Sequence, residues 1–222
     1  MFCYNMRIRR KAWVRPELEA CNFFVDEPVK NYGNWAGQFD VQKPMHLELG
    51  CGKGSFIAKK ASSEVDVNFI AVDIKSEMLG LAKRNVQRVF YERNLEVKNV
   101  LLTAHNIERI NLVFGDEDRF DRIYINFCNP WPRAKHKKRR LTHPRQLNQY
   151  REFLSKKGEI YFKTDDCGLF EDSISYFKDA GFNIKYLTYD LHNSGFEGNV
   201  ETEHEKMFAS EGIKIKFLIA EV

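Results

Sequence analysis

The sequence predicts an α/β domain with a mostly parallel, seven-stranded sheet, helices on both faces and an antiparallel last strand. Three observations predict it. From Pro44 onward, short apolar runs alternate with longer amphipathic segments, as in β-α-β units. A glycine-rich loop directly follows the first of these runs. The length of 222 residues, 43% of them hydrophobic, suits one open sheet with its covering helices.

Seven apolar runs are the predicted strands, and amphipathic segments between them are the predicted helices. The strands are residues 45–49, 68–72, 99–103, 121–127, 158–163, 182–189 and 213–219. The first predicted helix begins near Ser55, and the others cover residues 76–93, 144–154, 169–180 and 202–210. Because the last two strands are separated only by the short 202–210 piece, we expect an antiparallel final pairing. Residues 1–43 are expected to form a basic N-terminal arm and lead-in segment, and residues 44–222 a single domain.

The cysteine and histidine patterns argue against disulfide and metal frameworks. The five cysteines are odd in number, far apart and never in a C-x-x-C pair, which is typical of reduced thiols in the cytoplasm. The six histidines show no ligand spacing, so no metal is expected. No apolar stretch of about 20 residues occurs, so neither export nor membrane spanning is expected.

The net charge of +4 is unevenly distributed. Residues 1–16 carry five basic side chains and residues 129–151 carry eight, both without an acidic one, so the rest of the chain has a net charge of −9. Two cationic blocks on an acidic body indicate a polyanionic partner that meets one defined surface. The alternative is a solvated charged face.

The glycine loop, residues 50–54, indicates a nucleoside-type cofactor. Gly50, Gly52 and Gly54 follow a predicted strand and precede a helix, so that backbone N–H groups face a crevice. The next strand ends at Asp73, where a carboxylate can bind both ribose hydroxyls. The spacing is G-x-G-x-G, unlike the dinucleotide fingerprint, and Glu48 would repel a pyrophosphate but hold a cationic aminoacyl group. These residues favour S-adenosylmethionine over a glycine turn without a ligand.

A stiff loop and a basic run follow the fourth predicted strand. Residues 128–133 read Cys-Asn-Pro-Trp-Pro-Arg and should face the crevice at the carboxyl ends of the strands. The basic run comes next, which places phosphate-attracting groups beside the predicted reaction centre. Its members, all predicted to contact RNA, are Lys135, His136, Lys137, Lys138, Arg139 and Arg140.

Five motifs together resemble the bacterial tRNA (guanine-N7-)-methyltransferases. They are Leu-Glu-Leu-Gly-Cys-Gly-Lys-Gly (47–54), Asn-Pro-Trp-Pro-Arg (129–133), Lys-His-Lys-Lys-Arg-Arg-Leu-Thr (135–142), Phe-Lys-Thr-Asp (162–165) and Thr-Glu-His-Glu (202–205). The resemblance covers nearly the whole chain and implies a Rossmann-like class I methyltransferase fold. It also implies methyl transfer from S-adenosylmethionine to N7 of a guanosine in the tRNA variable loop, at position forty-six in standard tRNA numbering.

The resemblance also assigns residues to the site. It implies that Glu48, Asp73, Asn106 and Asn129 line the S-adenosylmethionine site. It implies that the tRNA substrate is met by Arg133, Asp165, Thr202, Glu203, His204 and Glu205. The family more commonly has Asp where this chain has Asn106 and Asn129. A neutral amide can still hydrogen-bond there, but it carries no charge.

The chemistry of the reaction makes Asp165 the candidate catalytic residue. Guanine N7 has an in-plane lone pair and no hydrogen, so positioning is most of the task. Because the methylated ring becomes cationic, a nearby carboxylate favours the transition state. Asp165 follows the fifth predicted strand and suits this role. The alternative is that Asp165 and Asp166 only cap the helix beginning near Gly168, and Thr202-x-x-Glu205 likewise has the pattern of a helix capping box.

Two other functions compete with this hypothesis. Asn129-Pro130 has some likeness to the loop of adenine-N6 methyltransferases, although Trp131 precedes the second proline here. A catalytically inactive tRNA-binding protein would require a damaged glycine loop or the loss of Glu48 and Asp73, and neither is seen. The sequence does not specify whether the protein is a monomer or a homodimer, or which tRNAs it would modify.

Overall fold

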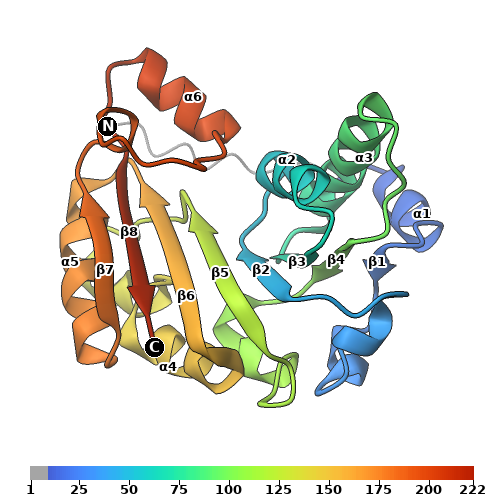
Figure 1. Cartoon of the computed structure of the whole chain (residues 1–222), viewed down its shortest axis with the longest axis horizontal. Helices are drawn as coiled ribbons and strands as arrows, with labels where there is room; N and C mark the ends of the chain where they lie inside the picture. Colours follow the sequence, from blue (N-terminus) through green and yellow to red (C-terminus); the bar gives the residue numbers. More distant parts are fainter. Residues whose placement is uncertain (1–9) are drawn as a thin grey trace.

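A computed structural model describes residues 10–222 as an eight-stranded sheet in the order β1-β4-β3-β2-β5-β6-β8-β7 (Figure 1). Neighbouring strands are parallel except for β8, which is antiparallel to both β6 and β7. The predicted antiparallel last strand is confirmed. The strands are β1 Phe24–Val25, β2 Met45–Leu49, β3 Asn68–Asp73, β4 Val100–Ala104, β5 Phe120–Asn126, β6 Leu154–Thr164, β7 Asn183–Thr188 and β8 Lys216–Glu221.

The predicted number of seven strands was one too few. The missed strand, β1, has only two residues and pairs with β4 at the edge of the sheet, and Thr103 Oγ1 donates to Val25 O at 2.7 Å. A two-residue strand leaves no periodic pattern in the sequence. The seven predicted strands are present, and β6 begins at Leu154, immediately after a helix, instead of at residue 158.

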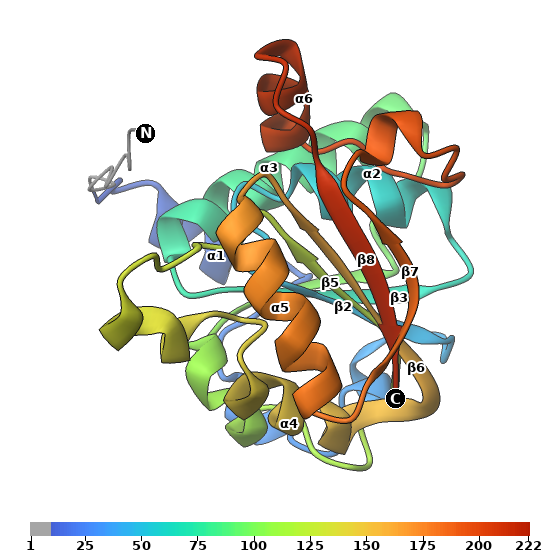
Figure 2. The ribbon, with the colours of Figure 1, turned by 90° about the vertical axis from the view of Figure 1, so that its left-hand side faces the viewer.

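Residues 10–222 contain six α-helices, of which five pack against one another in two groups and the sixth, α6, lies at the end of the sheet. They are α1 Val14–Glu19, α2 Ser55–Ser63, α3 Ser76–Glu92, α4 Pro144–Phe153, α5 Cys167–Asp179 and α6 Glu203–Ser210. Helices α1 and α2 both pack on α3, whereas α4 packs on α5. Figure 2 shows α5 in front of the strands, with α2 and α3 beyond them. The six-residue α1 was not predicted, and the described residues contain no helix both long and apolar enough to span a membrane.

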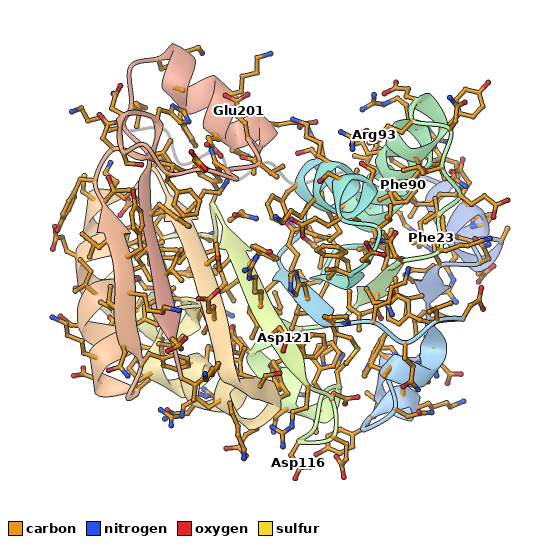
Figure 3. The ribbon with its side chains drawn as sticks, in the orientation of Figure 1. Phe23, Phe90, Arg93, Asp116, Asp121 and Glu201 are labelled. Atoms are coloured by element: carbon orange, nitrogen blue, oxygen red, sulfur yellow. The ribbon has the colours of Figure 1, made fainter. Side chains whose placement is uncertain are left out.

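Within residues 10–222, buried side chains form one large core, to which Phe23 and Phe90 belong (Figure 3), and one small one. Every residue of β2 is buried: Met45, Leu47 and Leu49 join the large core, and His46 and Glu48 between them are buried polar residues, as expected for a strand inside a parallel sheet. The small core gathers Leu191, Ile215, Phe217 and Ile219, with Phe127 and Phe208 packed against them. It supports the chain between β7 and β8, including α6, at the carboxyl end of the parallel strands.

Candidate active site

A pocket opens where the carboxyl ends of β2 and β5 meet the chain that leads into α6. We call it the central pocket. Figure 1 shows α6 lying across this end of the sheet, opposite α2, and Lys53 Nζ lies 3.2 Å from Glu203 Oε2 although the two residues are 150 positions apart. The pocket is lined by Glu48, Gly50, Cys51, Gly52, Lys53, Ser55, Phe56, Asn126, Phe127, Thr202, Glu203 and His204.

The glycine loop turns between β2 and α2 with three residues in the left-handed region, Gly50, Gly52 and Gly54. Gly50 N and Cys51 N donate to Val72 O at 2.8 and 3.1 Å, which fixes the loop to β3. A Cβ at Gly52 would meet no atom within 4 Å, whereas one at Gly54 would lie 2.6 Å from Ala82 Cβ. Gly54 therefore allows α2 to pack closely on α3, and Gly52 leaves open space for a ligand.

Glu48 is a buried carboxyl group in the wall of this pocket. Glu48 lies on β2 and is only 2% exposed. Its Oε1 accepts a hydrogen bond from Asn126 Nδ2 at 3.2 Å. Oε2 is buried and has no hydrogen-bond partner within residues 10–222. Burial raises the pKa of Glu48 to about 8, against the opposing effects of Asn126 and Lys163. The unused oxygen is available to a cationic group of a ligand.

Asp73 holds the glycine loop from the end of β3. Its Oδ2 accepts from Gly52 N and its Oδ1 from Lys75 N, both at 2.9 Å. Burial raises the pKa of this carboxyl group, and the two backbone N–H groups oppose the rise. Each oxygen retains a second lone pair, so the side chain supports the loop and can still accept hydrogen bonds from a ligand.

Asn106 and Asn129 lie outside the lining of the central pocket. Asn106 follows β4, where its Oδ1 accepts from Glu108 N at 3.0 Å, and the adjacent His105 N donates to Asp73 O. Asn129 Oδ1 accepts from Trp131 N at 3.1 Å and so shapes the loop after β5. Each side chain uses its carbonyl oxygen locally.

The loop after β5 is held by a buried arginine. Arg140, which is 3% exposed, donates from Nε to Pro130 O at 2.7 Å and forms an ion pair with Asp172 on α5. Phe127 and Trp131 have positive φ angles of 51° and 41°, which side chains rarely adopt. Such strain persists only where surrounding contacts fix it. The guanidinium of Arg140 is enclosed in the protein and holds this loop, and its expected contact with RNA stays a prediction.

Arg133 and the other members of the basic run differ in whether their side chains are already paired or packed within the protein. Lys137 shares Asp172 with Arg140 at 2.6 Å, and Arg139 lies over the Trp131 ring at 4.8 Å. The ring of His136 also packs beside Trp131. Arg133, Lys135 and Lys138 are exposed and form no ion pair with any residue between 10 and 222. These three are the side chains best placed to meet a polyanion.

The N-terminal basic block is only partly within the described chain. Arg7 and Arg9 lie outside the described residues. Arg15 forms ion pairs with Glu19 and Asp26, so its charge is balanced within the protein.

Asp165 and Asp166 have different roles in the structure. Asp166 is the N-cap of α5, where its Oδ1 accepts from Leu169 N at 2.6 Å. Asp165 is half-buried and its main-chain oxygen accepts from Lys216 Nζ at 2.8 Å, while burial raises the pKa of its side chain. The helix is therefore capped by Asp166 alone, and the carboxyl group of Asp165 is left for another role.

The Thr-Glu-His-Glu motif forms the predicted capping box at the start of α6. Thr202 Oγ1 accepts from Glu205 N at 3.0 Å, and Thr202, Glu203 and His204 line the central pocket. The ring of His204 faces that of Phe127 with centroids 6.1 Å apart and planes 22° apart. Glu205 is fully buried, 0% exposed, and accepts hydrogen bonds from Lys163, His192 and Asn199. The side chain of Glu205 is thus enclosed and supports the motif, and its expected contact with the substrate stays a prediction.

Sequence reasoning missed several residues of the pocket. Phe127 and Asn126 line it from the end of β5, and Lys163 on β6 donates to Glu205 of the adjoining α6. The position of Phe127 at a strand end was a usable signal, whereas a lysine within a strand reads as a solvent-facing residue. No cluster of three or more potential metal ligands occurs within residues 10–222, and the expected absence of a metal stays a prediction.

Comparisons with known proteins identify relatives over nearly the full chain. A family model described as a putative methyltransferase matches residues 42–218. The tRNA (guanine-N(7)-)-methyltransferase of Clostridium beijerinckii is 61% identical over 97% of this chain and 98% of its own. The tRNA (guanine-N(7)-)-methyltransferase of Clostridium botulinum strain Alaska E43 is 59% identical over the same shares.

Solved structures share the fold at much lower identity. The 16S rRNA methyltransferase KamB superposes with a TM-score of 0.59 at 14% identity, covering 84% of this chain and 90% of that one. An antibiotic-related methyltransferase gives a TM-score of 0.56 at 20% identity, covering 84% and 89%. These likenesses confirm the predicted class I methyltransferase architecture.

Proposed function

The chain belongs to the tRNA (guanine-N(7)-)-methyltransferase family, and from this premise we propose that it methylates N7 of a guanosine in tRNA with S-adenosylmethionine. The resemblance of the five motifs is confirmed at the level of the family. We further propose that the target is the variable-loop guanosine at position forty-six and that the protein acts in the cytoplasm.

The observation that carries the proposal is the buried Oε2 of Glu48, which has no hydrogen-bond partner in the described part of the chain. S-adenosylmethionine supplies a methyl group on a sulfonium, together with an ammonium-bearing aminoacyl end. Glu48 would bind the ammonium, which would lower the pKa of the carboxyl group and satisfy its free oxygen. Gly52 leaves room for the backbone to approach the ligand, and Asp73 keeps acceptor sites for ribose hydroxyls. The residues present therefore fit this cofactor.

We propose that Asn106 and Asn129 complete the cofactor site through their amide groups. Asn106 stands beside Asp73 through the bond from His105 N to Asp73 O. Asn129 follows β5, the neighbour of β2 in the sheet. With their carbonyl oxygens engaged, the amide N–H groups are the atoms left to donate to a ligand.

The substrate side of the pocket would receive guanine between aromatic and acidic groups. The rings of Phe127 and His204 offer flat surfaces on which a base can stack. N7 carries its own lone pair, so no protein base has to remove a proton before the attack. The Asp165 carboxyl group, free of the capping role, would favour the cationic purine that forms.

The tRNA backbone would be held on the exposed side of the basic run. Arg133, Lys135 and Lys138 would bind phosphates directly, with Lys137, Arg139 and His136 at the margin. Arg140 would instead hold the loop in shape. The lead-in residues 10–43 would belong to the same domain as residues 44–222, because β1 pairs with β4 and α1 packs on α3.

The direct test is product analysis. Unmodified tRNA transcripts are incubated with the protein and labelled S-adenosylmethionine, and the nucleosides are separated. Label in 7-methylguanosine is expected, and it should disappear when the variable-loop guanosine is replaced by adenosine. Label in N6-methyladenosine would instead support the adenine methyltransferase. Binding of both ligands without any labelled nucleoside would support an inactive tRNA-binding protein.

A further inference from the structure

Lys163 is a buried cation that the proposed cofactor and substrate contacts do not use. It lies on β6, is 4% exposed and precedes Asp165 by two residues. Burial lowers its pKa, and the carboxylates of Glu205 and Glu48 oppose this effect. A buried ammonium is costly unless it is paired and hydrogen-bonded. The structure around Lys163 therefore has to supply those partners.

Among the described residues, Lys163 Nζ donates three hydrogen bonds, all to one segment between β7 and β8. They reach Glu205 Oε2 at 2.8 Å, Asn199 Oδ1 at 3.0 Å and Val200 O at 3.0 Å. Asn199 Nδ2 in turn donates to Glu205 Oε1 at 2.6 Å. One side chain from the middle of the sheet thus fixes residues 199–205, which include the pocket-lining Thr202, Glu203 and His204.

The same lysine lies next to two residues of the pocket wall on the proposed cofactor side, Asn126 and Phe56. Lys163 is the register partner of Asn126 on β5, and Asn126 donates to Glu48. Its Nζ lies 5.7 Å above the ring of Phe56, another residue of the pocket wall. The positive charge of Lys163 lowers the pKa of Glu48, while burial raises it.

We propose that Lys163 is a positioning residue that couples the two halves of the site, holding segment 199–205 over the central pocket while its charge is shared by Glu205 and Glu48. The identity of the two ligands rests on the proposed function. In this arrangement, a change in the charge of Glu205 alters the electrostatic environment of Glu48 through Lys163. A change in the charge of Lys163 alters the environment of both carboxyl groups.

Few charged groups surround Glu48 and Lys163 within the described chain. Glu48 is faced by Lys163 from β6, by Asp73 from β3 and by the buried Cys51 thiol of the glycine loop. Lys163 is further influenced by Glu201, and His192 Nε2 lies 2.9 Å from Glu205 Oε1. Removing Lys163 should therefore raise the pKa of Glu48, whereas neutralising Glu205 should lower it, because Lys163 would then act on Glu48 alone.

The test compares Lys163→Met and Glu205→Gln by ligand binding across pH. The probe is S-adenosylhomocysteine, which keeps the ammonium-bearing end, and its affinity is measured by calorimetry from about pH 6 to 9. We expect the pH midpoint of binding to move up by roughly one unit in Lys163→Met and down in Glu205→Gln. Lys163→Arg should restore part of the shift. The KM for tRNA should rise about tenfold in both uncharged variants, with a smaller change in kcat.

Lys60→Met is the matched control. Lys60 is also buried, on α2, and pairs with Glu64, but none of its hydrogen bonds to described residues reaches segment 199–205. It should leave both the pH midpoint and the KM for tRNA unchanged. If Lys163→Met is folded by circular dichroism and keeps the wild-type midpoint and KM, the coupling is refuted. If Lys163→Met does not fold, the coupling is equally refuted by a pH midpoint of binding that rises or stays unchanged in Glu205→Gln. Absence of 7-methylguanosine from the wild-type reaction would overturn the proposed function alone, since these binding shifts do not depend on turnover.

Discussion

The proposed cofactor half of the central pocket, around Glu48 and the glycine loop, and the proposed substrate half, between the loop after β5 and α6, are built in different ways. On the cofactor half, backbone geometry shapes the site, and a buried oxygen of Glu48 has no hydrogen-bond partner among residues 10–222. On the substrate half, most of the charged groups are already paired inside the protein, such as Arg140 with Asp172 and Glu205 with Lys163. The comparison teaches that charge in a sequence motif does not reveal whether the charge meets a ligand or holds the site together.

The largest expected effect comes from substitutions at the two adjacent aspartates after β6, which test whether a charge serves the ligand or the structure. Asp165→Asn should lower kcat on tRNA about 100-fold, because the carboxylate field at the purine is lost, while cofactor affinity stays near wild type. Single-turnover kinetics and calorimetry measure the two quantities. Asp166→Asn is the control, since asparagine also caps helices well and should preserve kcat. Equal kinetics for the two variants would remove Asp165 from the mechanism.

Glu48→Gln separates function from stability on the cofactor half. Affinity for S-adenosylhomocysteine should fall roughly tenfold to 100-fold with the loss of a charged hydrogen bond. The pKa of Glu48 is about 8 in the folded protein and near 4.5 in the unfolded chain, so the folded state binds the extra proton between these values. Wild-type stability should therefore fall as pH rises from about 4.5 to 8.

The glutamine variant lacks this pH dependence. Its melting temperature should exceed that of the wild type at pH 9 and approach it near pH 4. Thermal unfolding followed by circular dichroism at both pH values is the measurement. If the melting temperatures of the wild type and of Glu48→Gln fall equally between pH 5 and 8, Glu48 is not the group responsible for the pH dependence.

The basic run provides a test of intermediate size. Replacing Arg133, Lys135 and Lys138 with serine should reduce the slope of log affinity against log salt by about 2 to 3, at roughly 0.7 to 0.9 ions for each contact. Filter retention of tRNA between about 50 and 200 mM salt gives the slope. Arg140→Met is the contrasting variant and should lower the melting temperature while keeping the slope, because it leaves Asp172 without its buried partner. A lowered slope in Arg140→Met would mean that this guanidinium reaches the RNA.

The smallest expected effect is that of Asp73→Asn. Asp73→Asn keeps one acceptor oxygen for the loop or the ribose but loses the charge, so the cofactor affinity should fall by roughly threefold to tenfold. Asp73→Ala removes both acceptors and should cost about 1.5 to 3 kcal/mol of binding free energy. Calorimetry on the two variants ranks them, and equal affinities in both would remove the ribose assignment.

The sequence predicted the features that depend on local pattern. Hydrophobic periodicity located seven of the eight strands, and glycines next to a strand located the loop. It did not separate Asp165 from Asp166, because capping depends on a shift of one residue in the position where α5 begins. It did not single out Arg140 within the basic run, because its partner Asp172 lies 32 positions away on another helix. Such roles are set by tertiary contacts, which a pattern of residue types does not contain.

The buried carboxyl group of Glu48 also has a consequence for proton stoichiometry. With its pKa at about 8, it holds a proton in most molecules at neutral pH, and a cationic ligand would expel it. Loading the site would therefore release close to one proton for each molecule bound, and the enthalpy seen by calorimetry would depend on the ionisation heat of the buffer. Because the demethylated product keeps the same ammonium, that proton would return only when the product leaves.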